Sequence, residues 1–81
     1  MTLYQFELSD EMEQIEAFWD GILVGERKEE EFTIECRQID DFYVEYKKQG
    51  KHYVDMRYFR NPDLLKPYFD QMDNISNIVG D

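Results

Sequence analysis

Few side chains in this chain are of types that carry out catalysis. His52 is the single histidine and Cys36 the single cysteine, and acid–base or nucleophilic catalysis needs a second group within hydrogen-bond reach. With one strand of a predicted sheet between them, the two residues stand about 9–10 Å apart, which is two strand spacings. We therefore expect His52 to be structural and Cys36 to be a buried, inert thiol.

Carboxylates are abundant, with 19 acidic against 9 basic residues and a formal charge of −10. A pair such as Glu35 and Glu45 could flank a scissile bond in a small hydrolase. Acid pairs are unavoidable at this composition, however, and a domain of 81 residues has little room for a deep pocket. We predict a protein that is not an enzyme and holds no cofactor and no metal, since a lone cysteine excludes a multi-cysteine zinc site.

The charge is unevenly distributed along the chain. Residues 47–66 contain six basic and two acidic residues, and mix cations with rings as single-strand nucleic-acid binders do. The acidic remainder of the chain repels a polyanion, so we predict a solvated hairpin there and no nucleic-acid binding. A field polarised in this way favours contact with a basic protein surface or with a second copy.

Periodicity predicts the elements of the N-terminal part. Tyr4, Phe6 and Leu8 alternate with polar residues, which favours an extra N-terminal strand over residues 3–8. A helix follows over about 10–20, because Ser9 or Asp10 supplies an N-cap and apolar residues recur at helical spacing. Gly21 is expected to end this helix in the left-handed conformation. The apolar stripe of the helix comprises Met12, Ile15, Phe18, Trp19 and Ile22.

Four strands of an antiparallel meander are predicted between residues 22 and 59. Ile22 to Lys28 forms the first strand, weakened by Gly25, and the glutamates at 29–31 form a solvated turn. The apolar residues of the next three strands all occupy even positions, which are Phe32, Ile34, Cys36, Phe42, Val44, Tyr46, Val54, Met56 and Tyr58.

This shared parity predicts hairpin loops of odd length, because residues opposite one another on neighbouring strands lie on one face of the sheet. We expect a three-residue loop at 39–41 and another at 48–50, the latter with Gly50 at positive φ. Val44 would then face Val54. Helices would cover the apolar even face, and the odd face would carry aromatic and charged side chains.

The C-terminal part reads as a turn followed by a helix. Asn61, Pro62 and Asp63 supply a cap, a first helical position and an early acid, while Pro67 disfavours a helix that runs through it. We predict a turn at 62–65, a helix over 66–73 and a loosely docked tail at 74–81. The whole is one α+β domain over residues 1–81, a two-layer β-meander with an N-terminal and a C-terminal helix.

The start of the chain contains no basic and apolar leader, and the longest aliphatic run is Ile22-Leu23-Val24. That run is far short of the roughly 20 residues of a membrane span. We therefore predict a cytoplasmic protein that does not associate with a membrane.

The order of several short motifs resembles a group of small bacterial α+β proteins of unassigned function. The likeness runs over most of the chain and implies a shared α+β fold and a bacterial origin, with no activity, cofactor or site residue to carry over. The motifs are Phe18-Trp19-Asp20-Gly21, Gly25-Glu26-Arg27, Ile39-Asp40-Asp41-Phe42-Tyr43-Val44-Glu45 and Pro67-Tyr68-Phe69-Asp70-Gln71.

The predicted odd face mixes aromatic and charged side chains, as protein interfaces do. We predict a non-catalytic protein-interaction module that binds a protein partner or forms a homo-oligomer such as a dimer, with no small-molecule substrate identified. One alternative is an acidic mimic of nucleic acid that inhibits a nucleic-acid-binding protein through its N-terminal helix, and a second is a small hydrolase. The predicted partner-binding residues are Arg37, Tyr43, Glu45, Tyr53, Arg57 and Phe59.

Overall fold

The computed structural model describes residues 1–69. Its strands pair antiparallel in chain order, β1-β2-β3-β4, so the predicted α+β meander is confirmed. Residues 66–69 are helical, and the remainder of the predicted helix over 66–73, like the predicted tail at 74–81, lies outside the described residues. The elements are α1 (Leu3–Leu8), α2 (Glu11–Asp20), β1 (Ile22–Glu29), β2 (Phe32–Ile39), β3 (Phe42–Gln49), β4 (His52–Phe59) and the 3-10 helix η1 (Pro62–Leu65), which runs into helical residues 66–69.

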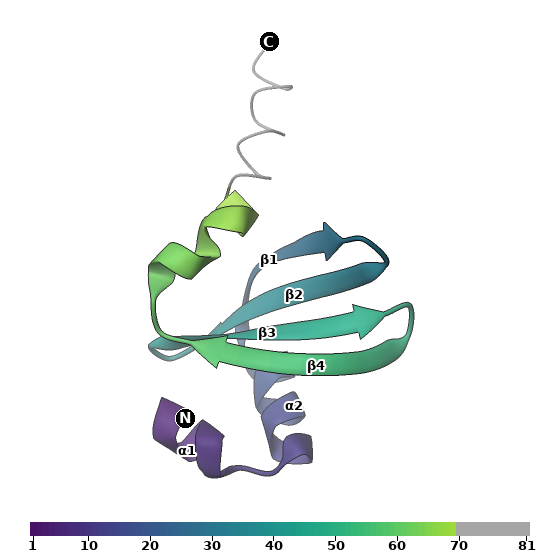
Figure 1. The fold of residues 1–81 in the computed structure, drawn as a ribbon. Coiled ribbons are helices and arrows are strands. Elements are labelled where there is room, and N and C mark those ends of the chain that lie inside the picture. The colour runs from purple at the N-terminus through teal and green to yellow at the C-terminus, as the bar shows by residue number, and fades with distance from the viewer. Residues whose placement is uncertain (70–81) are drawn as a thin grey trace.

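Helices cover both faces of the sheet. Figure 1 shows α1 and α2 against one face and the segment that follows β4 against the other. The prediction that both helical segments share one face is therefore wrong. The two faces bury separate apolar clusters, one of Phe6, Phe18, Ile39, Phe42 and Val44 under α1 and α2, the other of Cys36, Leu65 and Tyr68.

Two-residue turns join the strands, which contradicts the predicted odd loops. Ile39 pairs directly with Phe42 across Asp40 and Asp41, and Asp40 takes a positive φ of 52°, a conformation that a short polar side chain tolerates. Residues of opposite parity therefore face each other between β2 and β3. Cys36 lies on the face opposite to Val44, because burial on both faces removes the need for a single apolar parity.

The β3–β4 hairpin also differs from the predicted register. Gly50 has the expected positive φ of 60°, but the turn contains only Gly50 and Lys51. Val44 pairs with Tyr58, and the register shifts between Lys47 and Lys48. Val54 is the extra residue of this bulge, and the additional residue explains why Val44 and Val54 are not opposite each other.

Residues 3–8 form a helix, so the predicted N-terminal strand is wrong. Thr2 and Gln5 make a capping box, in which the Thr2 side chain accepts the Gln5 N–H and the Gln5 side chain accepts the Thr2 N–H. This reciprocal pair satisfies two of the free N–H groups at a helix start. Phe6 is buried and Leu3 packs beside it, at the spacing of one helical turn.

The helix α2 is confirmed, with Asp10 as its N-cap. Its buried residue is Phe18, whereas Met12 is 68% exposed and Trp19 46%. Gly21 ends α2 with φ −74° and ψ 169°, so the predicted left-handed conformation is wrong. Glycine is needed there for space, since a Cβ atom would lie 2.9 Å from the carbonyl oxygen of Gln38.

Candidate functional site: an acidic groove beside α2

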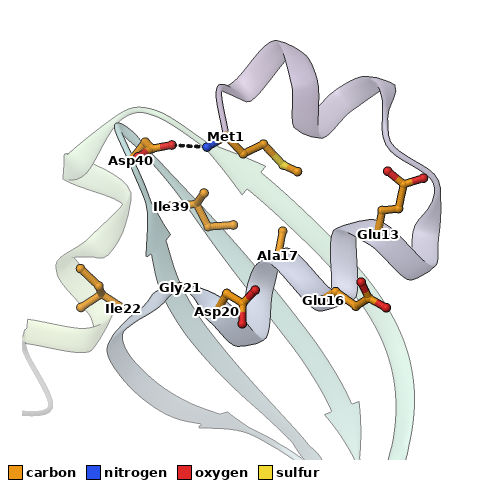
Figure 2. Close-up of a pocket in the computed structure, with 9 residues that line it drawn as sticks. All are labelled: Met1, Glu13, Glu16, Ala17, Asp20, Gly21, Ile22, Ile39 and Asp40. Carbon is orange, nitrogen blue, oxygen red and sulfur yellow. Dashed lines mark hydrogen bonds and ion pairs between the residues drawn. The ribbon is translucent and has the colours of Figure 1, made fainter.

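An open groove of 540 Å³ lies between α2 and the turn that joins β2 to β3. Figure 2 shows Glu13, Glu16 and Asp20 of α2 along the groove, with Ile39 and Asp40 facing them from the sheet. Its remaining lining residues are Met1, Ala17, Gly21 and Ile22. The groove thus combines a row of carboxylates with apolar side chains.

The carboxylates share one side of α2 because of their spacing. Glu13, Glu16 and Asp20 are three and four residues apart, and side chains at these intervals are neighbours on a helix surface. The Asp10 side chain fixes the start of the helix by accepting the Glu13 N–H at 2.9 Å. This row of acids could be predicted from the sequence.

The carboxylates of α2 repel one another. The pKa of Glu13 is raised, chiefly by the charge of Asp10, then by a hydrogen bond with Asp10, slight desolvation and the charge of Glu16. Asp20 stands in the last turn of α2, where a helix dipole disfavours an anion, and that turn has no basic residue. A cation bound beside these carboxylates would reduce their mutual repulsion.

One cation lies at the edge of the groove. The N-terminal amine of Met1 pairs with the Asp40 carboxylate, as Figure 2 shows. None of the nine lining residues is a lysine or an arginine. Glu13, Glu16 and Asp20 therefore face the groove without a basic side chain among its walls.

Arg37, one of the predicted partner-binding residues, binds other groups of the same chain at the end of α2. Its guanidinium donates to the carbonyl oxygens of Gly21 at 3.1 Å and Trp19 at 3.3 Å, and its Nε donates to Glu35 at 2.6 Å. It also lies over the Trp19 ring, 5.0 Å from the centroid. Arg37 thus supplies the cation that stabilises the C-terminal end of α2.

The other predicted partner-binding residues divide between the two faces of the sheet. Tyr43 and Phe59 pack together with ring centroids 5.6 Å apart, beside the cluster of Cys36, Leu65 and Tyr68. Tyr53 lies on the α2 face, with its ring centroid 5.2 Å from that of Tyr46.

Glu45 is only 7% exposed and accepts the Tyr68 hydroxyl at 2.6 Å, whereas Arg57 on the same face is exposed, 3.9 Å from Glu45. The structure therefore does not bring the six predicted residues together in one surface. Their contact with a partner stays a prediction.

The residues considered for catalysis are also dispersed. Burial, the largest effect, raises the pKa of the Cys36 thiol to about 12, so the reactive thiolate is disfavoured. Exposed His52 pairs with Gln49 near a hairpin tip. Glu35 faces the Arg37 side of the sheet and Glu45 the opposite side, so this pair cannot flank one bond.

Among residues 1–69, no group of three or more His, Cys, Asp or Glu residues is arranged to hold a metal ion. No helix within that range is long and apolar enough to cross a membrane. Comparison with known proteins finds no matching family model, no similar curated protein and no similar solved structure.

Sequence reasoning identified the acidic face of α2 but missed the groove. The groove exists because Ile39 and Asp40 approach α2, and their position depends on a strand register that local patterns do not encode. The one available signal was Gly21, which marks the place where the end of α2 meets the backbone of Gln38.

Proposed function

We propose that this chain is a non-catalytic protein-interaction module whose acidic groove binds a basic segment of a partner protein. The observation that carries the proposal is the combination of a row of carboxylates with exposed apolar surface in one groove. Ile22 lines the groove and is 73% exposed, and Leu23 beside it is 57% exposed.

The chemistry of the groove matches lysine and arginine side chains. Their aliphatic stems can lie along Ala17, Ile22 and Ile39, while their charged ends reach the carboxylates of Glu13 and Asp20. Contacts of this kind contribute orientation and association rate, and they weaken as salt rises. A partner segment that alternates basic and apolar residues would use both parts of the groove.

The test compares two variants that lose the same charge. The groove variant carries Glu13→Gln, Glu16→Gln and Asp20→Asn. The control carries Glu7→Gln, Glu30→Gln and Glu31→Gln, which are exposed positions outside the groove lining. The probe is a fluorescent peptide of alternating lysine and leucine, and its binding is measured by anisotropy over a range of salt concentrations.

We expect the groove variant to bind the peptide roughly tenfold more weakly, since three exposed charge contacts contribute about 0.2–1 kcal/mol each. The control should lose much less, and the affinity of the wild type should fall with salt. Equal weakening of both variants would show that only net charge matters. That result, or no binding by the wild type, would reject the groove as the site.

A further inference from the structure

The outer edge of β4 is a second surface with a definite chemistry. Among residues 1–69, β4 is the last strand of the sheet and pairs with β3 alone. An edge strand presents free N–H and C=O groups that can pair with another strand. The apolar side chains of β4 are unusually exposed, with Tyr53 at 37%, Val54 at 44% and Tyr58 at 42%.

Asp55 shows which backbone groups of β4 point away from β3. Its carboxylate accepts the backbone N–H of Met56 at 2.8 Å. Asp55 thereby occupies the place that a carbonyl oxygen of an added strand would take. In an antiparallel ladder, a residue whose N–H and C=O both point toward the neighbouring strand forms a hydrogen-bonded pair with the residue opposite. Met56 is therefore the natural centre for an added strand.

We infer that a second copy of this chain pairs with β4 in antiparallel orientation, with the two-fold axis between the two Met56 residues. In this register Asp55 lies opposite Arg57 of the second copy, and Arg57 lies opposite its Asp55. Two opposite-charge pairs form by symmetry. Registers centred on Asp55 or on Arg57 instead place two like charges on the axis, which is destabilising.

The charges already present on the sheet support this register. Lys47 pairs with Asp55 and Glu45 with Arg57 across β3 and β4. Addition of the second copy continues this alternation across the joined sheets. Positive Lys47 and negative Asp55 of one copy would be followed by positive Arg57 and negative Glu45 of the other. The bulge at Val54 ends the regular pairing, which comprises residues 55–57 of each copy. Val54 and Tyr58 flank this segment, and the second copy reduces the exposure of both side chains.

The experiment is a charge swap measured by sedimentation equilibrium. Asp55→Arg places Arg opposite Arg57, and Arg57→Asp places Asp opposite Asp55, so each single variant converts both pairs into repulsions. We expect each to dimerise at least about tenfold more weakly than the wild type, because cross-strand charge pairs contribute roughly 0.2–1 kcal/mol each. The double variant restores both pairs across the axis and should dimerise more tightly than either single variant, although the new arginine then lies beside Lys47 and the new aspartate beside Glu45 of the same copy.

Net charge cannot mimic this pattern. Asp55→Arg makes the chain less acidic and Arg57→Asp makes it more acidic, whereas the double variant keeps the wild-type charge of −10. If repulsion between acidic monomers controlled association, Asp55→Arg would strengthen the dimer. A stronger dimer in that variant would overturn the inference, as would failure of the double variant to recover or a wild type that is monomeric at every concentration.

A second readout does not depend on position 57, where aspartate would approach the buried Glu45 carboxylate and so lower stability. Met56→Cys places two thiols across the axis, with Cβ atoms about 4.5–5.5 Å apart, which is within about 1 Å of the roughly 3.5–4.5 Å found in disulfides. Mild oxidation should yield a disulfide-linked dimer. Lys51→Cys at the hairpin tip serves as the control and should cross-link much less. Equal cross-linking of the two variants would contradict the register.

Discussion

The hydrogen bond between Tyr68 and Glu45 should be among the most important single contacts of the fold. The Tyr68 hydroxyl donates to the Glu45 carboxylate at 2.6 Å, with Tyr68 2% and Glu45 7% exposed. Tyr68→Phe removes the donor and leaves a buried carboxylate without this partner. Hydrogen bonds to charged groups contribute about 1.5–3 kcal/mol, and an unsatisfied buried group adds its desolvation cost. We expect a loss of about 2 kcal/mol in the free energy of unfolding.

For a domain of this length, 1 kcal/mol corresponds to a Tm shift of about 4–8 °C. Tyr68→Phe should therefore lower Tm by roughly 8–16 °C, measured by thermal and urea unfolding. Tyr4→Phe is the matched control, because Tyr4 is 69% exposed and loses the same atom. The cost should shrink when Tyr68→Phe is made in a Glu45→Gln background, where the acceptor of the hydrogen bond is no longer charged. If Tyr68→Phe unfolds like the Tyr4 control, the hydrogen bond does not stabilise the fold and our reasoning is wrong.

Three further predictions address other parts of the fold. Gly21→Ala should destabilise the domain by about 1–3 kcal/mol in urea unfolding, since the new Cβ would lie 2.9 Å from the Gln38 carbonyl oxygen; an unchanged midpoint would refute that close approach. Glu30 has a φ of 59°, so Glu30→Gly should stabilise by about 0.5–1 kcal/mol, and no gain is expected from Glu31→Gly beside it. The Cys36 thiol has a pKa raised from 9.0 to about 12 by burial, so the unfolded chain loses this proton at a lower pH than the folded protein. The contribution of the thiol to the free energy of unfolding is therefore complete below pH 9 and is lost as the pH rises toward 12, by up to about 1.4 kcal/mol per pH unit. Unfolding measured at several alkaline pH values should show a shallower loss for Cys36→Val, and an identical pH slope in both proteins would contradict this.

Local signals were enough to predict α2, the four strands and the turn at Pro62. Asp10 caps α2 by accepting the Glu13 N–H, and Asn61 caps η1 by accepting the Asp63 N–H. Each of these signals acts within a few residues, which is the range that a sequence pattern describes. The prediction of a strand over residues 3–8 is wrong because an alternation of apolar and polar residues over so short a segment also fits a helix. The pair Thr2 and Gln5 was the signal that decided between the two.

The strand register could not be predicted because the argument assumed one buried face. Cys36 and Val44 are both fully buried, yet they project to opposite sides of the sheet into different clusters. A shared parity in the sequence therefore did not mean a shared face. The predicted partner surface rested on that assumption, and its residues were dispersed for the same reason.

The candidate groove was partly predictable. The spacing of Glu13, Glu16 and Asp20 places them on one side of a helix, and the sequence shows this directly. Their juxtaposition with Ile39 depends on contacts between residues distant in the chain, including the space left by Gly21 beside Gln38. Secondary-structure propensities depend on residues close in the sequence and therefore cannot predict such contacts.

Within residues 1–69, the two apolar clusters share a strand of the sheet but have no buried side chain in common. Lifting Tyr68 and Leu65 from the sheet would uncover Cys36 while Phe6 and Phe18 stay packed on the far side. Sub-global opening of this kind has a lower free energy than complete unfolding. The rate at which an alkylating reagent modifies the Cys36 thiol would then report how often that side of the sheet becomes exposed. Amide hydrogen exchange should be faster for the residues that pack with Tyr68 and Leu65 than for those that pack with Phe6 and Phe18.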